Sequence, residues 1–334
     1  MKRTLLLLSP FALLLSNVGT AYAICDWEMG SSVIQTVPSQ LIEIAADAPA
    51  SNTTPIATYD TPIMGHEIRY TECLVGTEIG RRVIGLDSYS TQYKTFKTQI
   101  PGIVIKPTWS NGTDLWGGFP SNIYMPATDE SGYVYFVFPA ISRYRVEFYK
   151  VSDNLSLNNT DGDVVMPAGD IGYFYLIVSN DPGNYLSKLA LNEIKIVSTP
   201  VCTADSAKTI NFETVTPKML SAGVSRPLDF FIRCKSDYGS YSATAYVTTE
   251  TPTTGNKAIK VTDGGGNTDR MQIAIKDSSS QALPLDGSRG ETITSTTSQS
   301  NAEFRWTAEL TKAGTAQPAA GPFSARAEII FDIK

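Results

Sequence analysis

The chain of 334 residues has one histidine, four cysteines and no apolar run long enough to cross a membrane. Ser-His-Asp and Cys-His mechanisms would therefore depend on His66 alone as their base. Its surroundings, Gly65 to Tyr70, are typical of a loop that enters a strand, so we expect no catalytic role for it. Because a transmembrane helix needs about 20 apolar residues, we also expect no membrane span.

Basic residues are also scarce, since 27 Lys and Arg stand against 33 Asp and Glu, a net charge of −6. Nucleic-acid binding needs a basic face that offsets the phosphate charge. The balance therefore argues against a nucleic-acid partner and says little else, because mild acidity is common among exported proteins.

Residues 1–23 have the order of a cleavable secretory signal peptide. Lys2 and Arg3 precede a largely apolar run from Leu5 to Leu15, and small residues at Ala21-Tyr22-Ala23 follow. The run is too short to span a bilayer. We expect a secreted mature chain that begins at Ile24 and has 311 residues. That length favours two domains over one.

The four cysteines are Cys25, Cys73, Cys202 and Cys234. An even number in an oxidising compartment favours disulfide bonds. Three pairings are possible, and we favour Cys25–Cys73 with Cys202–Cys234 because it closes one loop in each half of the chain. A zinc site is the competing interpretation, but the sequence has no Cys-x-x-Cys and a single histidine. We expect no metal and no cofactor.

Short runs rich in Val, Ile, Thr, Tyr and Phe alternate with turn residues along the whole chain. No long stretch has the apolar spacing of a helix. The sequence therefore predicts an all-β fold of two immunoglobulin-like, antiparallel β-sandwich domains in tandem. We expect domains over 24–197 and 202–334, joined by a linker over 198–201 in which Pro200 stops a strand. So short a linker predicts domains placed end to end.

Four segments have informative alternation. Residues 228–235 and 303–310 are apolar at every second position, with Phe231 as the exception, which predicts strands with one core face and one wet face. Residues 133–138 and 173–178 are apolar on both faces, which predicts strands covered on both sides. The alternative is that these two segments form an interaction surface.

The C-terminal residues predict one long strand with an inward apolar face. Its apolar positions are Phe323, Ala325, Ala327, Ile329, Phe331 and Ile333. A last strand with an uncovered edge is an aggregation hazard unless something pairs with it. Either an earlier strand completes the fold, or this strand flanks a groove that accepts a strand from another protein.

Residues 200–334 resemble the pilin domain of chaperone–usher fimbrial subunits. The resemblance rests on residues 304–310, on the Gly-x-Phe-x-Ala-x-Ala pattern from Gly321, and on two cysteines that flank Ile210-Asn211-Phe212. It implies a C-terminal domain that is incomplete and lacks its last strand. A periplasmic pilus chaperone would lend a strand, and the next fimbrial subunit would replace it at the outer-membrane usher by donor-strand exchange. Ile333 departs from the family's frequent penultimate Tyr, so we expect weaker chaperone anchoring.

A shaft subunit carries a donor strand before its first pilin-domain cysteine, whereas here a whole domain precedes Cys202 and only Ile24 precedes Cys25. The expectation is a tip subunit of a fimbrium, or pilus, on the bacterial cell surface. Residues 24–197 resemble, more weakly, the receptor-binding domains of two-domain fimbrial adhesins, through the early cysteine pair, residues 98–103, residues 146–150 and a Pro-Ala-Gly turn at 167–169. The resemblance implies cell adhesion by a lectin that binds a host glycan or glycoprotein receptor.

Two alternatives stay open, an adhesin for a protein receptor and a secreted glycan hydrolase. A hydrolase needs a pair of carboxylates, and the spacing of Asp114, Asp129, Glu130 and Asp153 selects no pair. We expect a binding protein and not an enzyme.

Sugar binding requires an aromatic platform beside hydroxyl-binding polar groups. The Gly-rich segment 109–119 offers Trp109, Asn111, Asp114 and Trp116, and Tyr124 is a weaker candidate. The alternative is that Trp109 ends a core strand and the rest is an ordinary loop. Arg81 and Arg82 could meet sialic acid or sulfate, although an exposed solubilising pair is the more common situation.

Overall fold

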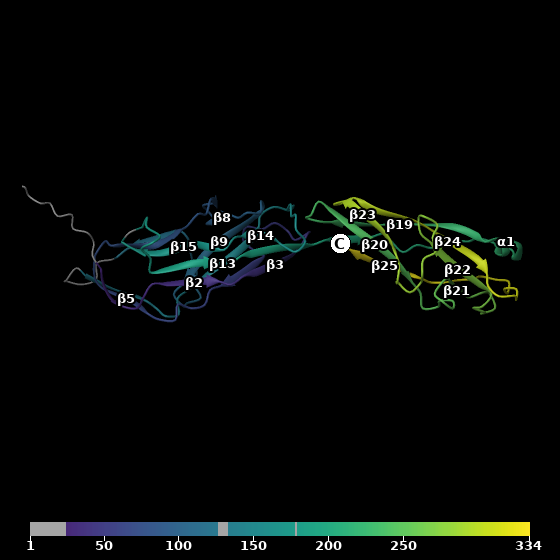
Figure 1. Cartoon of the computed structure of the whole chain (residues 1–334), viewed down its shortest axis with the longest axis horizontal. Helices are drawn as coiled ribbons and strands as arrows, with labels where there is room; N and C mark the ends of the chain where they lie inside the picture. The colour runs from purple at the N-terminus through teal and green to yellow at the C-terminus, as the bar shows by residue number, and fades with distance from the viewer. Residues whose placement is uncertain (1–24, 126–132, 178) are drawn as a thin grey trace, which may run out of the picture.

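The computed structural model describes residues 25–125, 133–177 and 179–334, so the expected signal peptide lies outside the described residues. The described residues form two β-domains placed end to end in an elongated molecule, and the chain ends beside the junction between them (Figure 1). Within these ranges no helix is both long and apolar enough to cross a bilayer. The all-β, two-domain prediction is confirmed.

Two large sheets form the sandwich of the N-terminal domain. The first has the order β4-β13-β9-β8-β7 with β10 paired to β9; the second has the order β11-β6-β15-β16-β2. The strands of the first are β4 (Ala57–Asp60), β13 (Arg143–Lys150), β9 (Ile103–Ser110), β8 (Thr95–Lys97), β7 (Ser88–Ser90) and β10 (Gly117–Gly118). Those of the second are β11 (Ser121–Tyr124), β6 (Glu78–Val83), β15 (Gly169–Leu176), β16 (Ser187–Leu191) and β2 (Val33–Val37).

Two smaller sheets close the ends of this domain. One has the order β1-β5-β12 and the other β14-β17-β3. Their strands are β1 (Asp26–Met29), β5 (Ile68–Leu74), β12 (Tyr133–Phe138), β14 (Asp163–Met166), β17 (Ile194–Thr199) and β3 (Gln40–Ala45). Pairing is antiparallel except that β16 pairs with β2, and β17 with β3, in parallel. The prediction of wholly antiparallel sheets was therefore wrong for these pairs, because alternation reports faces and not partners.

Alternation along β13 explains how the core forms. Tyr144, Val146 and Phe148 are buried between the sheets, whereas Arg143, Arg145 and Glu147 point the other way. The predicted two-sided burial holds for β15, where every residue from 173 to 176 is buried. It does not hold for β12, because the Tyr135 side chain is 53% exposed.

Two sheets also form the C-terminal domain, with orders β18-β19-β24-β22-β21 and β23-β20-β25. Their strands are β18 (Val201–Ala204), β19 (Val224–Lys235), β24 (Asn301–Lys312), β22 (Met271–Lys276), β21 (Ile259–Val261), β23 (Glu291–Thr297), β20 (Ser240–Thr248) and β25 (Glu328–Ile333). The alternation predicted for residues 228–235 and 303–310 is confirmed in β19 and β24, which pair along ten residues. Phe230 stacks on Phe304 with ring centroids 5.1 Å apart, and Trp306 is buried against them.

The C-terminal segment is less regular than predicted. Only β25 forms a ladder, with β20, and a single bridge between Thr262 and Ser324 holds the segment before it. The prediction of one long strand was therefore wrong for residues 323–327. The inward face is present, since Phe323, Ala325, Ile329, Phe331 and Ile333 pack on the core.

A short helix, α1 (Pro217–Ala222), was not predicted. The Thr216 side chain caps it by accepting from the Met219 N–H, Pro217 begins it, and Gly223 ends it with φ of 86°. Proline at the first position and glycine past the last are the usual signals of helix ends, and this helix is too short to show apolar periodicity.

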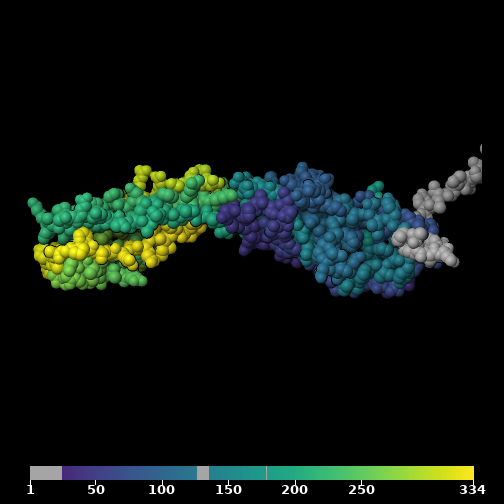
Figure 2. Space-filling model, turned by 180° about the vertical axis from the view of Figure 1, so that it is seen from behind, coloured from purple at the N-terminus to yellow at the C-terminus, as the bar shows by residue number. Residues whose placement is uncertain are grey.

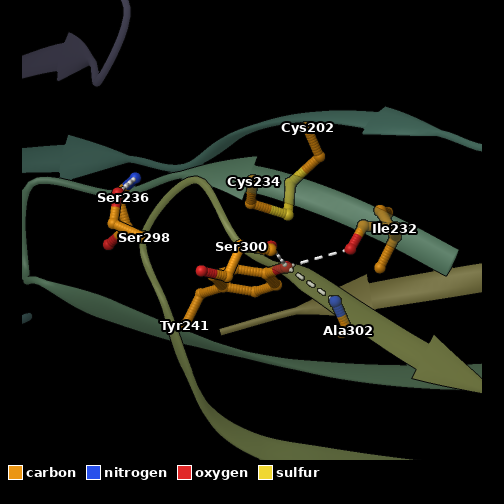
Figure 3. Close-up of a disulfide and its surroundings, with 8 residues drawn as sticks. All are labelled: Cys202, Ile232, Cys234, Ser236, Tyr241, Ser298, Ser300 and Ala302. Carbon is orange, nitrogen blue, oxygen red and sulfur yellow. Dashed lines mark hydrogen bonds between the residues drawn. A yellow bond between two sulfur atoms is a disulfide. The ribbon is translucent and has the colours of Figure 1, made fainter.

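Both disulfide bonds predicted from the sequence are present, Cys25–Cys73 and Cys202–Cys234. The second joins β18 to the neighbouring β19, where the two cysteines face each other in the ladder. Figure 3 shows it beside the buried Tyr241 of β20.

The connection between the domains is shorter than the four-residue linker predicted. Ser198 and Thr199 extend β17 along β3, and Val201 already pairs with Lys235 in β18. Only Pro200 falls outside a strand. Proline lacks the N–H that a ladder needs, so the chain changes partner there.

Candidate strand-accepting groove and candidate ligand-binding surface

An apolar groove of about 880 Å³ runs along the C-terminal domain. Residues 204–212 form one wall and residues 323–331 form the other. The floor consists of apolar side chains from both sheets, among them Leu228, Phe230, Val247, Ile273, Ile275 and Ala308. Figure 2 shows the hollow between the green band that begins the domain and the yellow band that ends it.

Each wall of the groove continues the outermost strand of one sheet. In the sheet orders of the described residues, β18 and β25 are both edge strands. An edge strand has backbone N–H and C=O groups without a ladder partner on one side. A further strand lying in the groove could pair with such an edge and place every second side chain on the apolar floor.

Five of the alternating residues expected at the groove do line it: Phe323, Ala325, Ala327, Ile329 and Phe331. Ile333 does not line it, because it pairs with Ala243 and packs on the core beyond the groove. Ala327 is exposed, so its small side chain leaves the groove open at that point. The opposite wall, residues 204–212, was missed because it has no regular alternation.

The five ligand-binding candidates of the N-terminal domain do not gather at one place. Trp109 packs against the core between the sheets. Trp116 lies on the other face, with the Arg145 guanidinium 4.0 Å from its ring centroid. Asn111 and Asp114 are exposed in the turn between them, and Tyr124 is 62% exposed on the edge strand β11.

Arg81 and Arg82 are also separated, because successive residues of β6 face opposite ways. Arg82 is half-exposed and lies 3.8 Å from the Glu78 carboxylate. Arg81 is 7% exposed, and its guanidinium lies 3.2 Å from the ring centroid of Trp109 and 3.9 Å from that of Phe174. Burial lowers the pKa of Arg81 to about 9. The expectation of an exposed pair was therefore wrong for Arg81.

The groups considered for catalysis lie in ordinary structural positions. His66 Nε2 lies 2.7 Å from the Ser31 carbonyl oxygen, which ties the loop before β5 to the segment after β1. Asp153 accepts a hydrogen bond from the Ala50 N–H, and Asp114 is exposed. Asp129 and Glu130 lie outside the described residues.

Comparison with known proteins identifies the C-terminal half. Residues 193–334 match the family model described as "Fimbrial protein". No curated protein matches the chain in sequence.

The solved structures that the chain matches are distant in sequence. The receptor-binding domain of the plasmid-borne adhesin MrkD1P of Klebsiella pneumoniae is 16% identical over 56% of this chain and 99% of that chain, with a TM-score of 0.35. The CsuC–CsuE chaperone–tip subunit complex of Acinetobacter baumannii gives 11% identity over 92% of this chain and 100% of that chain, with a TM-score of 0.42. The CupB6 tip adhesin of Pseudomonas aeruginosa gives 13% over 92% and 93%, with a TM-score of 0.34.

The match of the family model covers every strand of the C-terminal domain, including both edges of the groove. The C-terminal domain of this chain is a fimbrial protein domain.

Proposed function

We propose that this chain is a fimbrial tip adhesin, held in the pilus by a donor strand that enters the C-terminal groove. The observation that carries the proposal is the apolar groove between two sheet edges in a fimbrial domain. A donor strand with apolar residues at every second position would pair with an edge and complete the sandwich. The domain is in this sense incomplete and lacks its last strand.

The chemistry of the groove defines the partners. During export through the periplasm a pilus chaperone would occupy it, because an apolar groove with an open edge would otherwise aggregate. At the outer-membrane usher the next fimbrial subunit would replace the chaperone strand with its own. The chain would then stand at the tip of a fimbrium on the bacterial surface.

The tip position is supported by two strands that could in principle act as donor strands, because both are already paired within this chain. The residues just before the fimbrial domain form β17, which pairs with β3 along all six of its residues. The first described strand, β1, is paired with β5 and tied to it by Cys25–Cys73. Neither strand is available to another subunit, so the chain would accept a strand without offering either of these two.

Adhesion would be the role of the N-terminal domain, by binding a host glycan. A protein receptor is the second candidate, because Trp27 and Tyr135 of the small sheet β1-β5-β12 are 61% and 53% exposed. Figure 1 places β5 of this sheet at the end of the molecule far from the fimbrial domain, where a surface receptor would be met first.

The groove is tested with Ala327→Lys, which places a long charged side chain where the wall is small and open. Co-expressed with its pilus chaperone, the variant should be captured at least about tenfold less, because an unpaired ammonium on an apolar floor is costly. Ala316→Lys is the matched control, because Ala316 is exposed and lies outside the groove lining. Normal capture of a folded Ala327→Lys protein would contradict the proposal.

The receptor class is tested by a glycan array on the full chain, beside attachment to host cells. Selective binding to a glycan would support a lectin. Attachment to cells without binding to any glycan would favour the protein receptor, and variants at Trp27 and Tyr135 would then be the next to measure.

A further inference from the structure

Arg81 is a buried cation that lacks a carboxylate partner among the described residues. It lies on β6, next to the edge strand β11 of the second large sheet, with its side chain toward the first sheet and 7% of its surface exposed. The other buried cation of this domain, Lys150, has three backbone carbonyl oxygens within 3.4 Å of its Nζ. Buried charges in proteins are normally paired or fully hydrogen-bonded, so Arg81 is exceptional here.

Two aromatic rings lie against the Arg81 guanidinium. The Trp109 and Phe174 centroids lie 3.2 and 3.9 Å from its central carbon. Cation–π attraction offsets part of the cost of burial. It uses only the faces of the group, and the N–H donors in its plane still need acceptors.

Several donors around this group lack an acceptor within the described structure. Arg81 Nε, Trp109 Nε1 and Ser121 Oγ are all enclosed and make no hydrogen bond. Ser121 is the direct cross-strand partner of Arg81 in the β11–β6 ladder, so their side chains share a face. The unsatisfied Nε of Arg81 therefore lies with two further unsatisfied donors, Trp109 Nε1 and Ser121 Oγ.

We propose that the Arg81 guanidinium, held between Trp109 and Phe174, binds an anionic group of the receptor, the carboxylate or sulfate of an acidic sugar. Because Nε is enclosed, the anion would approach the two terminal Nη groups, where two parallel N–H···O bonds can form. This inference rests on the proposed adhesin function and adds the class of ligand. It also gives Trp109 a role different from that of a sugar-stacking platform, since its ring orients the cation.

The rigid setting of Arg81 favours this arrangement. A side chain at Gly117 would begin about 2.5 Å from the Trp109 ring, so the glycine allows the indole to lie flat over its neighbour strand. Phe174 is fixed by an edge-on contact with Phe138 at 4.1 Å. A preorganised cation loses little freedom when it binds.

The test is a titration of the full chain with three trisaccharide or disaccharide probes, namely sialyllactose, sulfated lactose and neutral lactose, followed by tryptophan fluorescence. We expect binding of at least one acidic probe and at least about tenfold weaker binding of neutral lactose, since hydrogen bonds to charged groups are worth about tenfold to a hundredfold. The first two probes separate a carboxylate from a sulfate as the source of the anion.

The matched variants are Arg81→Met and Arg82→Met, which remove neighbouring cations from opposite faces of β6. Arg81→Met should weaken binding of the acidic probe at least about tenfold. Arg82→Met should change the affinity for that probe less than about threefold. Trp109→Phe keeps a ring over the guanidinium and removes one donor, so it should weaken binding while the far-ultraviolet circular dichroism of the β fold persists.

Equal affinity for acidic and neutral probes, or unchanged binding in a folded Arg81→Met protein, would overturn the inference. So would an Arg82→Met effect as large as that of Arg81→Met. None of these results would affect strand capture at the groove. Loss of chaperone capture with normal binding of the acidic probe would instead concern assembly through the groove alone and would leave the Arg81 inference unaffected.

Discussion

The side chain of Tyr241 connects the two sheets of the C-terminal domain. Tyr241 is 2% exposed, and its hydroxyl lies 2.6 Å from the Ser300 carbonyl and 2.9 Å from the Ile232 carbonyl while accepting from the Ala302 N–H (Figure 3). A hydroxyl has one proton, so it donates to one carbonyl at a time. This one side chain thereby links β20 to both β19 and the start of β24.

Tyr241→Phe should lower the free energy of unfolding by about 1–3 kcal/mol, because it leaves buried backbone groups without a partner. Urea unfolding at pH 7 measures the loss. Tyr246→Phe is the control on the same strand, where the ring is only half-buried. Equal stability of the two variants would show that the hydroxyl network contributes nothing.

The Asp263 carboxylate anchors the segment before the groove wall, because it accepts a hydrogen bond from the Ala319 N–H. Hydrogen bonds from the Ala319 N–H, the Asn267 side chain and nearby backbone N–H groups hold the pKa of its carboxyl well below the usual range. A depressed folded-state pKa stabilises the fold above the unfolded value of about 3.9, and that stability is lost as the pH falls below it. Asp263→Asn should therefore reduce the difference in unfolding midpoint between pH 7 and pH 3.

The Asp286 carboxyl should keep part of this pH dependence in the variant, because Ser288 lowers its pKa to about 2. The pH dependence that remains in the Asp263→Asn variant therefore includes the part that Asp286 contributes. If Asp263→Asn leaves the whole difference between pH 7 and pH 3 unchanged, Asp263 has no part in acid unfolding.

Among the elements, β18 depends most on a covalent bond. It is four residues long, it lies at a sheet edge, and it continues into a groove wall that has no ladder. The Cys202–Cys234 bond ties it to the long strand β19 across a sequence separation of 32 residues. The wall therefore stays beside the groove floor when the groove is open.

Replacing Cys202 and Cys234 together with alanine should lower the stability of the C-terminal domain by about 3–4 kcal/mol, because a loop of this length then gains freedom in the unfolded chain. Hydrogen exchange read by mass spectrometry separates the domains by peptide. The corresponding Cys25 and Cys73 variant should leave C-terminal exchange unchanged. Unchanged hydrogen exchange of the C-terminal peptides in the variant without Cys202 and Cys234 would contradict the prediction.

For the whole molecule, the junction consists of more than the connecting residue Pro200. The Asp237 carboxylate accepts from the Leu155 N–H at 3.2 Å and from the Ser198 hydroxyl at 2.7 Å. Tyr238 packs on the N-terminal core and accepts from the Ser198 N–H. A loop of the fimbrial domain thus binds the N-terminal domain directly, and the end-to-end arrangement is fixed by side chains.

Asp237→Ala should loosen this arrangement, because the Leu155 N–H and the Ser198 hydroxyl lose their acceptor. Small-angle X-ray scattering should then give a broader distance distribution with a shorter mean length. Asp229→Ala, on the exposed face of β19, is the control. Scattering identical to that of the unchanged chain would mean that the short connection alone sets the orientation.

Local patterns in the sequence determined most strands, the two-domain division and the inward face of the C-terminal segment, whereas they favoured one of three cysteine pairings. Alternation in residues 228–235 and 303–310 is a local property, since it depends only on which neighbours are apolar. Tertiary structure alone decided which strands became partners, that residues 204–212 form the second wall of the groove, and that Trp109 and Trp116 lie apart. It also placed Arg81 inside and Arg82 outside, because a dibasic pair in a strand has no local signal for which residue faces the core.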